Sequence, residues 1–183
     1  FQKIGYCKQM EGDLKGALDA YLHADLLNSE SKWVIRRIAG CYRSLKQPKE
    51  ALKYYHRYEA LNPDNLSVQI SIGHCHLELK DYNEALKCFF KVDYLDNKSH
   101  KAWRPIAWCS FLTGKYDQAR NYYKKILDNQ PNTQDLLNAG HTEWALQNIK
   151  GALSFYQQAV QKENGNFLKF QEQFNQDVAD LLI

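Results

Sequence analysis

Cysteine and histidine are the side chains whose spacing first points to a chemical site in this sequence. Four of the five cysteines recur at an interval of 34 residues: Cys7, Cys41, Cys75 and Cys109. His74 and His76 flank one of them. Thiolates and imidazoles together bind zinc, and paired thiols form disulfides. Whether any of these groups can meet depends on the elements that carry them.

The constant interval indicates one structural position repeated on successive helices. Packed helices lie about 10 Å apart, which is too far for a disulfide or for a shared zinc ion. His74, Cys75 and His76 are neighbours on one helix and therefore point in different directions. We interpret the cysteines as small buried fillers with reduced thiols, which favours a cytoplasmic location. No metal and no cofactor is expected.

Catalytic motifs are missing from the sequence. It contains no His-Glu-x-x-His and no Gly-x-Ser-x-Gly pattern. Gly114-Lys115 lacks the upstream glycine and the following hydroxyl of a phosphate-binding loop. We therefore predict that this chain is not an enzyme.

Composition narrows the possible partners. The 183 residues include 24 Lys and Arg against 21 Asp and Glu, a formal charge of +3, and both signs are scattered along the chain. This balance disfavours nucleic acid, because phosphate contacts require concentrated positive charge. No apolar stretch reaches the roughly 18 to 20 residues of a membrane-spanning helix. The chain opens at Phe1 without Met, within an expected helix, so we expect that the true N-terminus is missing.

Small and aromatic residues repeat at the same interval as the cysteines. One column is alanine: Ala17, Ala51, Ala85, Ala119 and Ala152. A second column is glycine or alanine: Gly5, Ala39, Gly73, Ala107 and Gly140. A third is aromatic: Tyr21, Tyr55, Phe89, Tyr123 and Tyr156. Apolar residues three and four apart predict two amphipathic helices per unit, which the small residues allow to pack closely.

Each unit has 34 residues and two predicted helices. An apolar residue followed by a small one comes first, then Ala-x-x-x-aromatic, then proline. This pattern resembles the tetratricopeptide repeat. The resemblance implies an all-α fold, a right-handed α-solenoid of stacked antiparallel helix pairs with about eleven helices. We expect five repeats over residues 1–166, with these bounds: 1–31, 32–65, 66–99, 100–132 and 133–166. Lys8 and His76 replace an aromatic residue that is usual at their position.

The last segment, 167–183, is predicted to be one amphipathic helix. Its apolar residues step by three and four: Phe167, Phe170, Phe174, Val178 and Leu181. A stacked array needs a terminal unit with a polar outer face, so we interpret this helix as a C-terminal cap. A docking helix for another part of a longer protein is the alternative.

The resemblance also implies a concave face, lined by the first helix of each repeat, on which partner peptides lie. When the 34-residue register is used to place this face on the present sequence, the expected partner-binding residues are Arg36, Arg37, Arg43, His74, Lys101, Arg104, Trp108, Phe111, Asn138, His141 and Trp144. Arginine and tryptophan often dominate binding energy. Replacing Arg104 and Trp108 by Ala is expected to weaken partner binding and to leave stability nearly unchanged.

Some family members clamp a C-terminal carboxylate with basic and amide side chains. Arg36 and Lys101 stand at suitable positions, but Gly40, Ser71 and Pro105 replace the asparagines and the arginine of that pattern. The clamp is therefore incomplete, although an acidic or aromatic peptide fits the expected groove.

The leading hypothesis is a non-catalytic protein–protein interaction scaffold that binds an extended peptide or a helix of a partner protein on its concave face. Self-assembly through the terminal helix or the open repeat edge, as a homodimer, is one alternative. A substrate-recruiting segment of a larger enzyme is another.

Overall fold

The computed structural model describes the backbone of residues 1–96 and 99–181 and the side chains up to residue 177, apart from those of residues 97 and 98. The side chains of Val178 and Leu181, and the whole of residues 182–183 of the expected cap, lie outside the described part. Within these ranges every regular element is helical, with eleven α-helices and one short 3-10 helix. The all-α prediction is confirmed.

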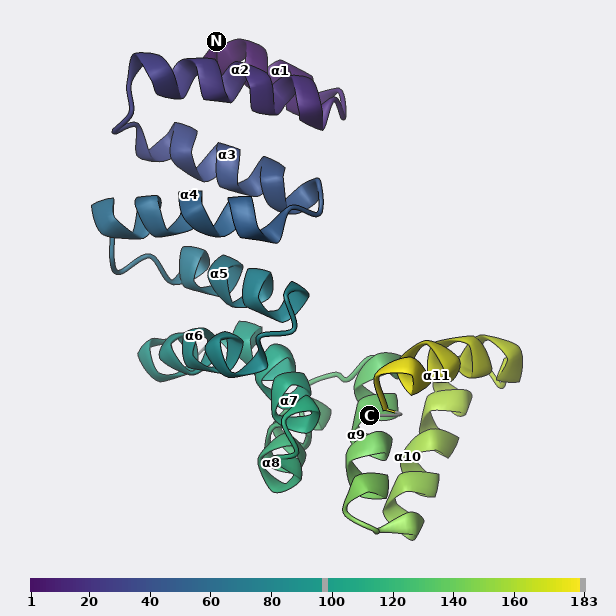
Figure 1. Cartoon of the computed structure of the whole chain (residues 1–183). Helices are drawn as coiled ribbons and strands as arrows, with labels where there is room; N and C mark the ends of the chain where they lie inside the picture. The colour runs from purple at the N-terminus through teal and green to yellow at the C-terminus, as the bar shows by residue number, and fades with distance from the viewer. Residues whose placement is uncertain (97–98, 182–183) are drawn as a thin grey trace. The chain divides into compact units, whose positions relative to one another are not determined.

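Two compact units make up the chain, Phe1–Val92 and Asp93–Ile183. The first holds α1 (Gln2–Met10), α2 (Leu14–Leu27), α3 (Lys32–Ser44), α4 (Pro48–Leu61), α5 (Leu66–Glu78) and most of α6 (Tyr82–Leu95). The second holds the 3-10 helix η1 (His100–Ala102), α7 (Trp103–Leu112), α8 (Tyr116–Leu127), α9 (Thr133–Ala145), α10 (Ile149–Lys162) and α11 (Phe167–Leu181). Within the first unit, successive helices lie side by side in chain order (Figure 1).

The turn inside each helix pair has one recurring geometry. A residue with positive φ follows the first helix of each pair: Gly12, Lys46, Lys80, Gly114 and Gln147. The next residue donates its N–H back into the helix, as Gln47 does to the carbonyl of Tyr42 at 2.9 Å. This is a Schellman cap, which satisfies the last carbonyls of a helix and reverses the chain. Identical caps therefore set the same hairpin five times.

Close contact between the two helices of a pair depends on the column of glycine or alanine residues in the first helix. A Cβ placed on Gly73 of α5 would lie 2.7 Å from Cε1 of Phe89 on α6. Gly5 and Tyr21 meet in the same way in the first pair, at 2.6 Å. Only a residue without a side chain leaves room for the aromatic ring at these two positions.

Contact between pairs depends on the second helix. In the first unit, Ala17, Tyr21 and Ala24 of α2 form one buried cluster with residues of α3. The α3 side of this cluster consists of Val34, Ile38 and Cys41. Within this unit the second helix of one pair thus covers the first helix of the next, so neighbouring pairs share apolar core.

The cysteine column is buried at three of its four positions. Cys41, Cys75 and Cys109 are fully buried, and burial raises the pKa of Cys75 to about 11 and that of Cys109 to about 12. These thiols are unreactive fillers, as the sequence predicts. Cys7 is exposed instead, because no second helix in the described chain covers this side of α1.

Arginine–carboxylate pairs join neighbouring helix pairs at the edges of the apolar core. Arg57 of α4 donates hydrogen bonds to Asp25 of α2 from its two terminal guanidinium nitrogens, at 2.6 and 2.9 Å. In the second unit Arg120 of α8 binds Glu143 of α9 at 2.7 and 2.8 Å. Two parallel hydrogen bonds fix orientation as well as distance.

We expect Ala85→Leu to lower the free energy of unfolding by about 1–3 kcal/mol, because a fully packed position must take a larger side chain. Ala85 of α6 is 0% exposed. Chemical denaturation followed by circular dichroism measures the effect. An unchanged midpoint would contradict the assignment of Ala85 to the buried alanine column.

Candidate functional site

A pocket of about 330 Å³ opens in the first unit on the side formed by first helices. It is lined by Gln9 of α1, by Trp33, Arg36, Arg37 and Gly40 of α3, by Tyr55 of α4 and by Ser71 of α5. Apart from Tyr55, every lining residue comes from the first helix of a pair. The glycine and the serine that interrupt the carboxylate clamp both line this pocket, and their small size leaves it open.

Arg37 is held in place by its neighbours. Its guanidinium carbon lies 5.0 Å from the centre of the Trp33 ring and 5.6 Å from that of Tyr6. It also donates a hydrogen bond to Oε1 of Gln9 at 3.4 Å. These contacts orient the side chain before any partner binds.

Arg36 is exposed, and among the described residues it forms no ion pair. Burial raises the pKa of the neighbouring Tyr55, and the hydrogen bond with Ser71 and the charges of Arg43 and Arg36 oppose that shift. Arg36 is thus a cation at the rim of the pocket, open to a partner anion.

Arg43 and His74, which the sequence also assigns to partner contact, are half-buried. The His74 ring packs edge to face on Phe89 at 5.2 Å between centres. Burial and the nearby charge of Arg43 lower the pKa of His74. We therefore expect a neutral imidazole at neutral pH, so the positive charge of this side is supplied by arginines.

In the second unit, Arg104 is held in a pair of its own. It binds Asp135 through two hydrogen bonds of 2.8 Å each, and Asp135 is only 3% exposed. The same carboxylate accepts from the backbone N–H of Asn132, whose side chain in turn caps α9. Replacing Arg104 would leave a buried carboxylate without its cation, so the expectation of unchanged stability does not hold.

Trp108 and Phe111 stack on each other at 5.5 Å between ring centres, with 13° between the ring planes. Phe111 is only 8% exposed and belongs to the core that α7 and α8 share with α9. Lys101, by contrast, is exposed on η1. Of these three residues only Lys101 is exposed, since Trp108 is half-buried and Phe111 is buried.

The C-terminal helix covers part of α9. His141 is 3% exposed, with Nδ1 at 2.9 Å from the hydroxyl of Tyr156 and Nε2 at 3.3 Å from Asp177 of α11. Asn138 is half-buried and accepts a hydrogen bond from Gln134 at 3.0 Å. Trp144, at the end of α9, is 55% exposed. His141 therefore contributes to packing in this structure, whereas Trp144 is open to contact.

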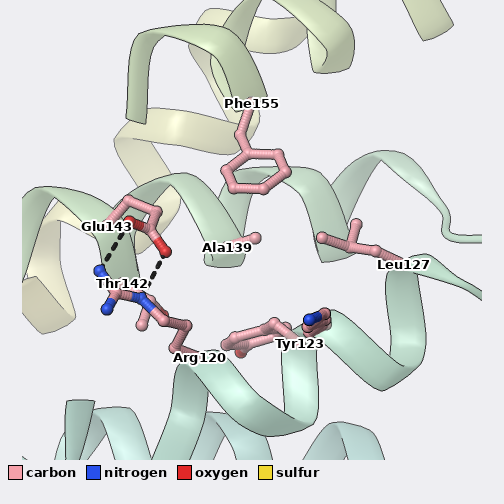
Figure 2. Close-up of a pocket in the computed structure, with 8 residues that line it drawn as sticks. Arg120, Tyr123, Leu127, Ala139, Thr142, Glu143 and Phe155 are labelled. Carbon is pink, nitrogen blue, oxygen red and sulfur yellow. Dashed lines mark hydrogen bonds and ion pairs between the residues drawn. The ribbon is translucent and has the colours of Figure 1, made fainter. Parts of the chain in front are cut away.

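Sequence reasoning missed a second, apolar pocket of about 210 Å³ in the second unit. Figure 2 shows Phe155 of α10 and Tyr123 of α8 on opposite sides of Ala139, with the Arg120–Glu143 pair at one end and Leu127 at the other. Its residues come mainly from the second helices of the pairs. The predicted groove involves only first helices, so the prediction did not include this pocket.

The described residues hold no group of three or more His, Cys, Asp or Glu placed to bind a metal ion. In the described part of the chain, no helix is long and apolar enough to cross a membrane.

Comparisons with known proteins agree with this architecture. The sequence model of a tetratricopeptide repeat matches residues 106–133, and that of subunit 3 of the anaphase-promoting complex, or cyclosome, matches residues 17–92. A search of curated protein sequences gives no match. These matches support a tetratricopeptide-repeat protein, and that fold implies a protein-interaction scaffold.

Solved structures share the fold at low sequence identity. MamA from Desulfovibrio magneticus RS-1 is 14% identical over 90% of this chain and 93% of its own, with a TM-score of 0.84. YrrB, described as a TPR protein with an unusual peptide-binding site, is 19% identical over 93% of this chain and 89% of its own, with a TM-score of 0.80. Another MamA structure is 17% identical over 89% of this chain and 90% of its own, also at 0.80.

Proposed function

We propose that this chain is a non-catalytic protein-interaction module that binds an acidic peptide segment of a partner protein along its first helices. The contact is centred on the pocket of the first unit. The observation that carries the proposal is the pair of adjacent arginines there: Arg36 is exposed and has no ion pair among the described residues, and Arg37 is fixed against Trp33 and Tyr6.

The chemistry of the pocket favours a carboxylate ligand flanked by apolar groups. A guanidinium binds a carboxylate through two hydrogen bonds, and a fixed side chain loses little entropy when it does so. Trp33, 42% exposed, lines the same pocket as the arginines and offers apolar surface to the peptide beside its acidic group. The peptide-binding site named for YrrB supports a peptide as the class of ligand.

The repeat bounds given by the sequence are part of this proposal, with pairs at 1–31, 32–65, 66–99, 100–132 and 133–166 and a cap from residue 167. The starts of α3, α5, η1, α9 and α11 follow this register closely. We also propose a cytoplasmic location, on the spacing of the cysteines alone.

Arg36→Ala is expected to weaken peptide binding at least about tenfold, because a charge-assisted hydrogen bond is worth roughly 1.5–3 kcal/mol. Random 16-residue peptides displayed on phage would be selected on the wild-type chain. Their affinities for wild type and variants would then be measured by fluorescence anisotropy.

Lys49→Ala is the matched control, since Lys49 is an exposed cation on α4 and does not line the pocket. It should bind the selected peptides as the wild type does. Selected peptides without Asp or Glu, or an equal loss in both variants, would count against the proposal.

A further inference from the structure

Three arginines of α3 differ from the other arginines of the chain. Each of the others forms an ion pair with an aspartate or glutamate of the neighbouring helix pair: Arg57, Arg104 and Arg120. The three on α3 have no carboxylate within ion-pair distance among the described residues: Arg36, Arg37 and Arg43. In the described part of the chain, one helix therefore carries three positive charges without a counter-ion.

Two of these three side chains are partly withdrawn from water. Arg36 is exposed, but Arg37 and Arg43 are half-buried. The partners of Arg37 are two aromatic rings and the amide of Gln9, which carry no negative charge. Glu78 of α5 is a carboxylate in this region, but it is exposed and no ion pair joins it to Arg43. Because a guanidinium without a counter-ion is costly to withdraw from water, the site favours a ligand that supplies one.

Gly40 lies between these arginines and has no packing role. Glycine weakens the interior of a helix relative to alanine. At Gly73 the close approach of an aromatic ring explains the glycine, but a Cβ on Gly40 would meet nothing within 4 Å. Gly40 also lines the pocket of the first unit. It therefore leaves bare backbone in the pocket, which allows a ligand to approach α3 closely.

The three arginines act on the same pocket. Arg36, Gly40 and Arg43 are spaced four and three residues apart, so they lie on one face of α3. Arg36 and Arg37 line the pocket. Arg43 does not, but its charge, like that of Arg36, opposes the raised pKa of Tyr55, which does line it. The pocket thus lies within a cluster of three cations.

One carboxylate does not balance this cluster. It has a single negative charge, and one guanidinium can occupy both of its oxygens. A phosphate monoester carries a charge of about −1.5 to −2 at pH 7 and three acceptor oxygens. It can therefore accept hydrogen bonds from two or three guanidinium groups at once.

We propose that the acidic group preferred by the pocket of the first unit is a phosphorylated side chain of the peptide, bound by Arg36, Arg37 and Arg43 against the bare backbone of Gly40. This inference rests on the proposed function and names the acidic group of its peptide. Trp33, 42% exposed in the same pocket, contacts a residue beside the phosphate. The carrier of the phosphate is accordingly a peptide and not the free ion.

The test uses residues 1–183 and four fluorescein-labelled peptide mixtures that are degenerate except at the centre. The fixed centre is phosphoserine, phosphotyrosine, serine or two adjacent glutamates, and the glutamate pair matches the phosphate in charge. Titrations followed by fluorescence anisotropy give the affinities. At least one phosphorylated mixture should bind at least about tenfold more tightly than the diglutamate mixture, because the phosphate accepts additional charge-assisted hydrogen bonds at one point.

Two variants separate binding of the phosphate from stability. Arg43→Gln should lower the affinity for the phosphorylated mixture to about that for the diglutamate mixture. Gly40→Leu should raise the denaturation midpoint, because leucine favours a helix and its Cβ meets no neighbour. It should nevertheless weaken phosphopeptide binding at least about tenfold, because the new side chain occupies the place of the phosphate. Lys49→Ala, the control on α4, should bind as the wild type does.

Equal affinities for the phosphorylated and diglutamate mixtures would overturn this inference, and the proposed function would stand if Arg36→Ala weakens both. The absence of binding to every acidic mixture would overturn both. Phosphopeptide binding that is unchanged in Arg43→Gln and Gly40→Leu would overturn the placement of the phosphate on α3. Inorganic phosphate that competes as strongly as the phosphopeptide, or a single-stranded oligonucleotide that binds more tightly, would overturn a peptide as the carrier.

Discussion

Replacing Phe89 by Ala is expected to lower the free energy of unfolding by about 3–5 kcal/mol, the range for large aromatic residues removed from a core. Phe89 of α6 is 0% exposed and fills the space that Gly73 of α5 leaves open. Its loss would remove the ring that packs against Gly73 and leave a cavity in the core. Urea denaturation followed by circular dichroism measures the change.

Tyr94→Ala is the matched control for Phe89→Ala. Tyr94 lies on the same helix but is 87% exposed, so its replacement should change stability by less than about 0.5 kcal/mol. A similar loss in both variants would show that helix propensity, and not packing, determines the result.

The same contact can be tested from the side of the glycine. Gly73→Ala should be destabilising, because its Cβ would lie 2.7 Å from Phe89. Leucine is smaller than phenylalanine, so Phe89→Leu should make room for this Cβ and relieve part of that loss. The effects of the two changes should therefore not be additive. Additive losses would contradict direct contact between the two positions.

The second large effect is expected for Arg120→Met, which should cost about 2–4 kcal/mol at pH 7, because it leaves a buried carboxylate without its cation. Glu143 of α9 is 7% exposed and is hydrogen-bonded by Arg120 and Asn148. Burial alone would raise the pKa of Glu143, but the bonds from Arg120 and Asn148 outweigh burial and lower it.

The sign of the pH dependence follows from this lowered pKa. In the wild type, Glu143 adds stability above the ordinary carboxyl pKa of about 4.5, and this contribution is lost as pH falls through the lower folded value. In Arg120→Met, burial dominates and the folded pKa rises, so the charged form destabilises the fold at pH 7. The deficit of the variant should therefore shrink as pH falls toward about 4.

Denaturation midpoints of wild type and Arg120→Met between pH 4 and 8 would test this prediction. Lys124→Met is the control, since it removes an exposed cation from the same helix. A deficit of Arg120→Met that is constant over this range would mean that Glu143 does not titrate with the expected shift.

Several predicted binding residues have structural partners that the sequence pattern does not show. Arg104 pairs with Asp135, 31 residues away, and His141 meets Asp177, 36 residues away. Phe111 turns into the core of the second unit. In each case the helix is the predicted one, but the direction of the side chain depends on a neighbour from another pair. Arg36 and Arg37, in the first unit, have no such carboxylate partner in the described residues.

By itself the sequence determined the helices, their pairing and the class of repeat. Those properties follow from a local pattern in which small, aromatic and turn residues recur every 34 positions, so each pair can be recognised without knowing its neighbours. Only the tertiary structure decided which of the repeated positions are free to bind. Burial depends on what lies against a residue, and the pattern is the same for covered Ile38 and uncovered Ile4, for buried Cys41 and exposed Cys7.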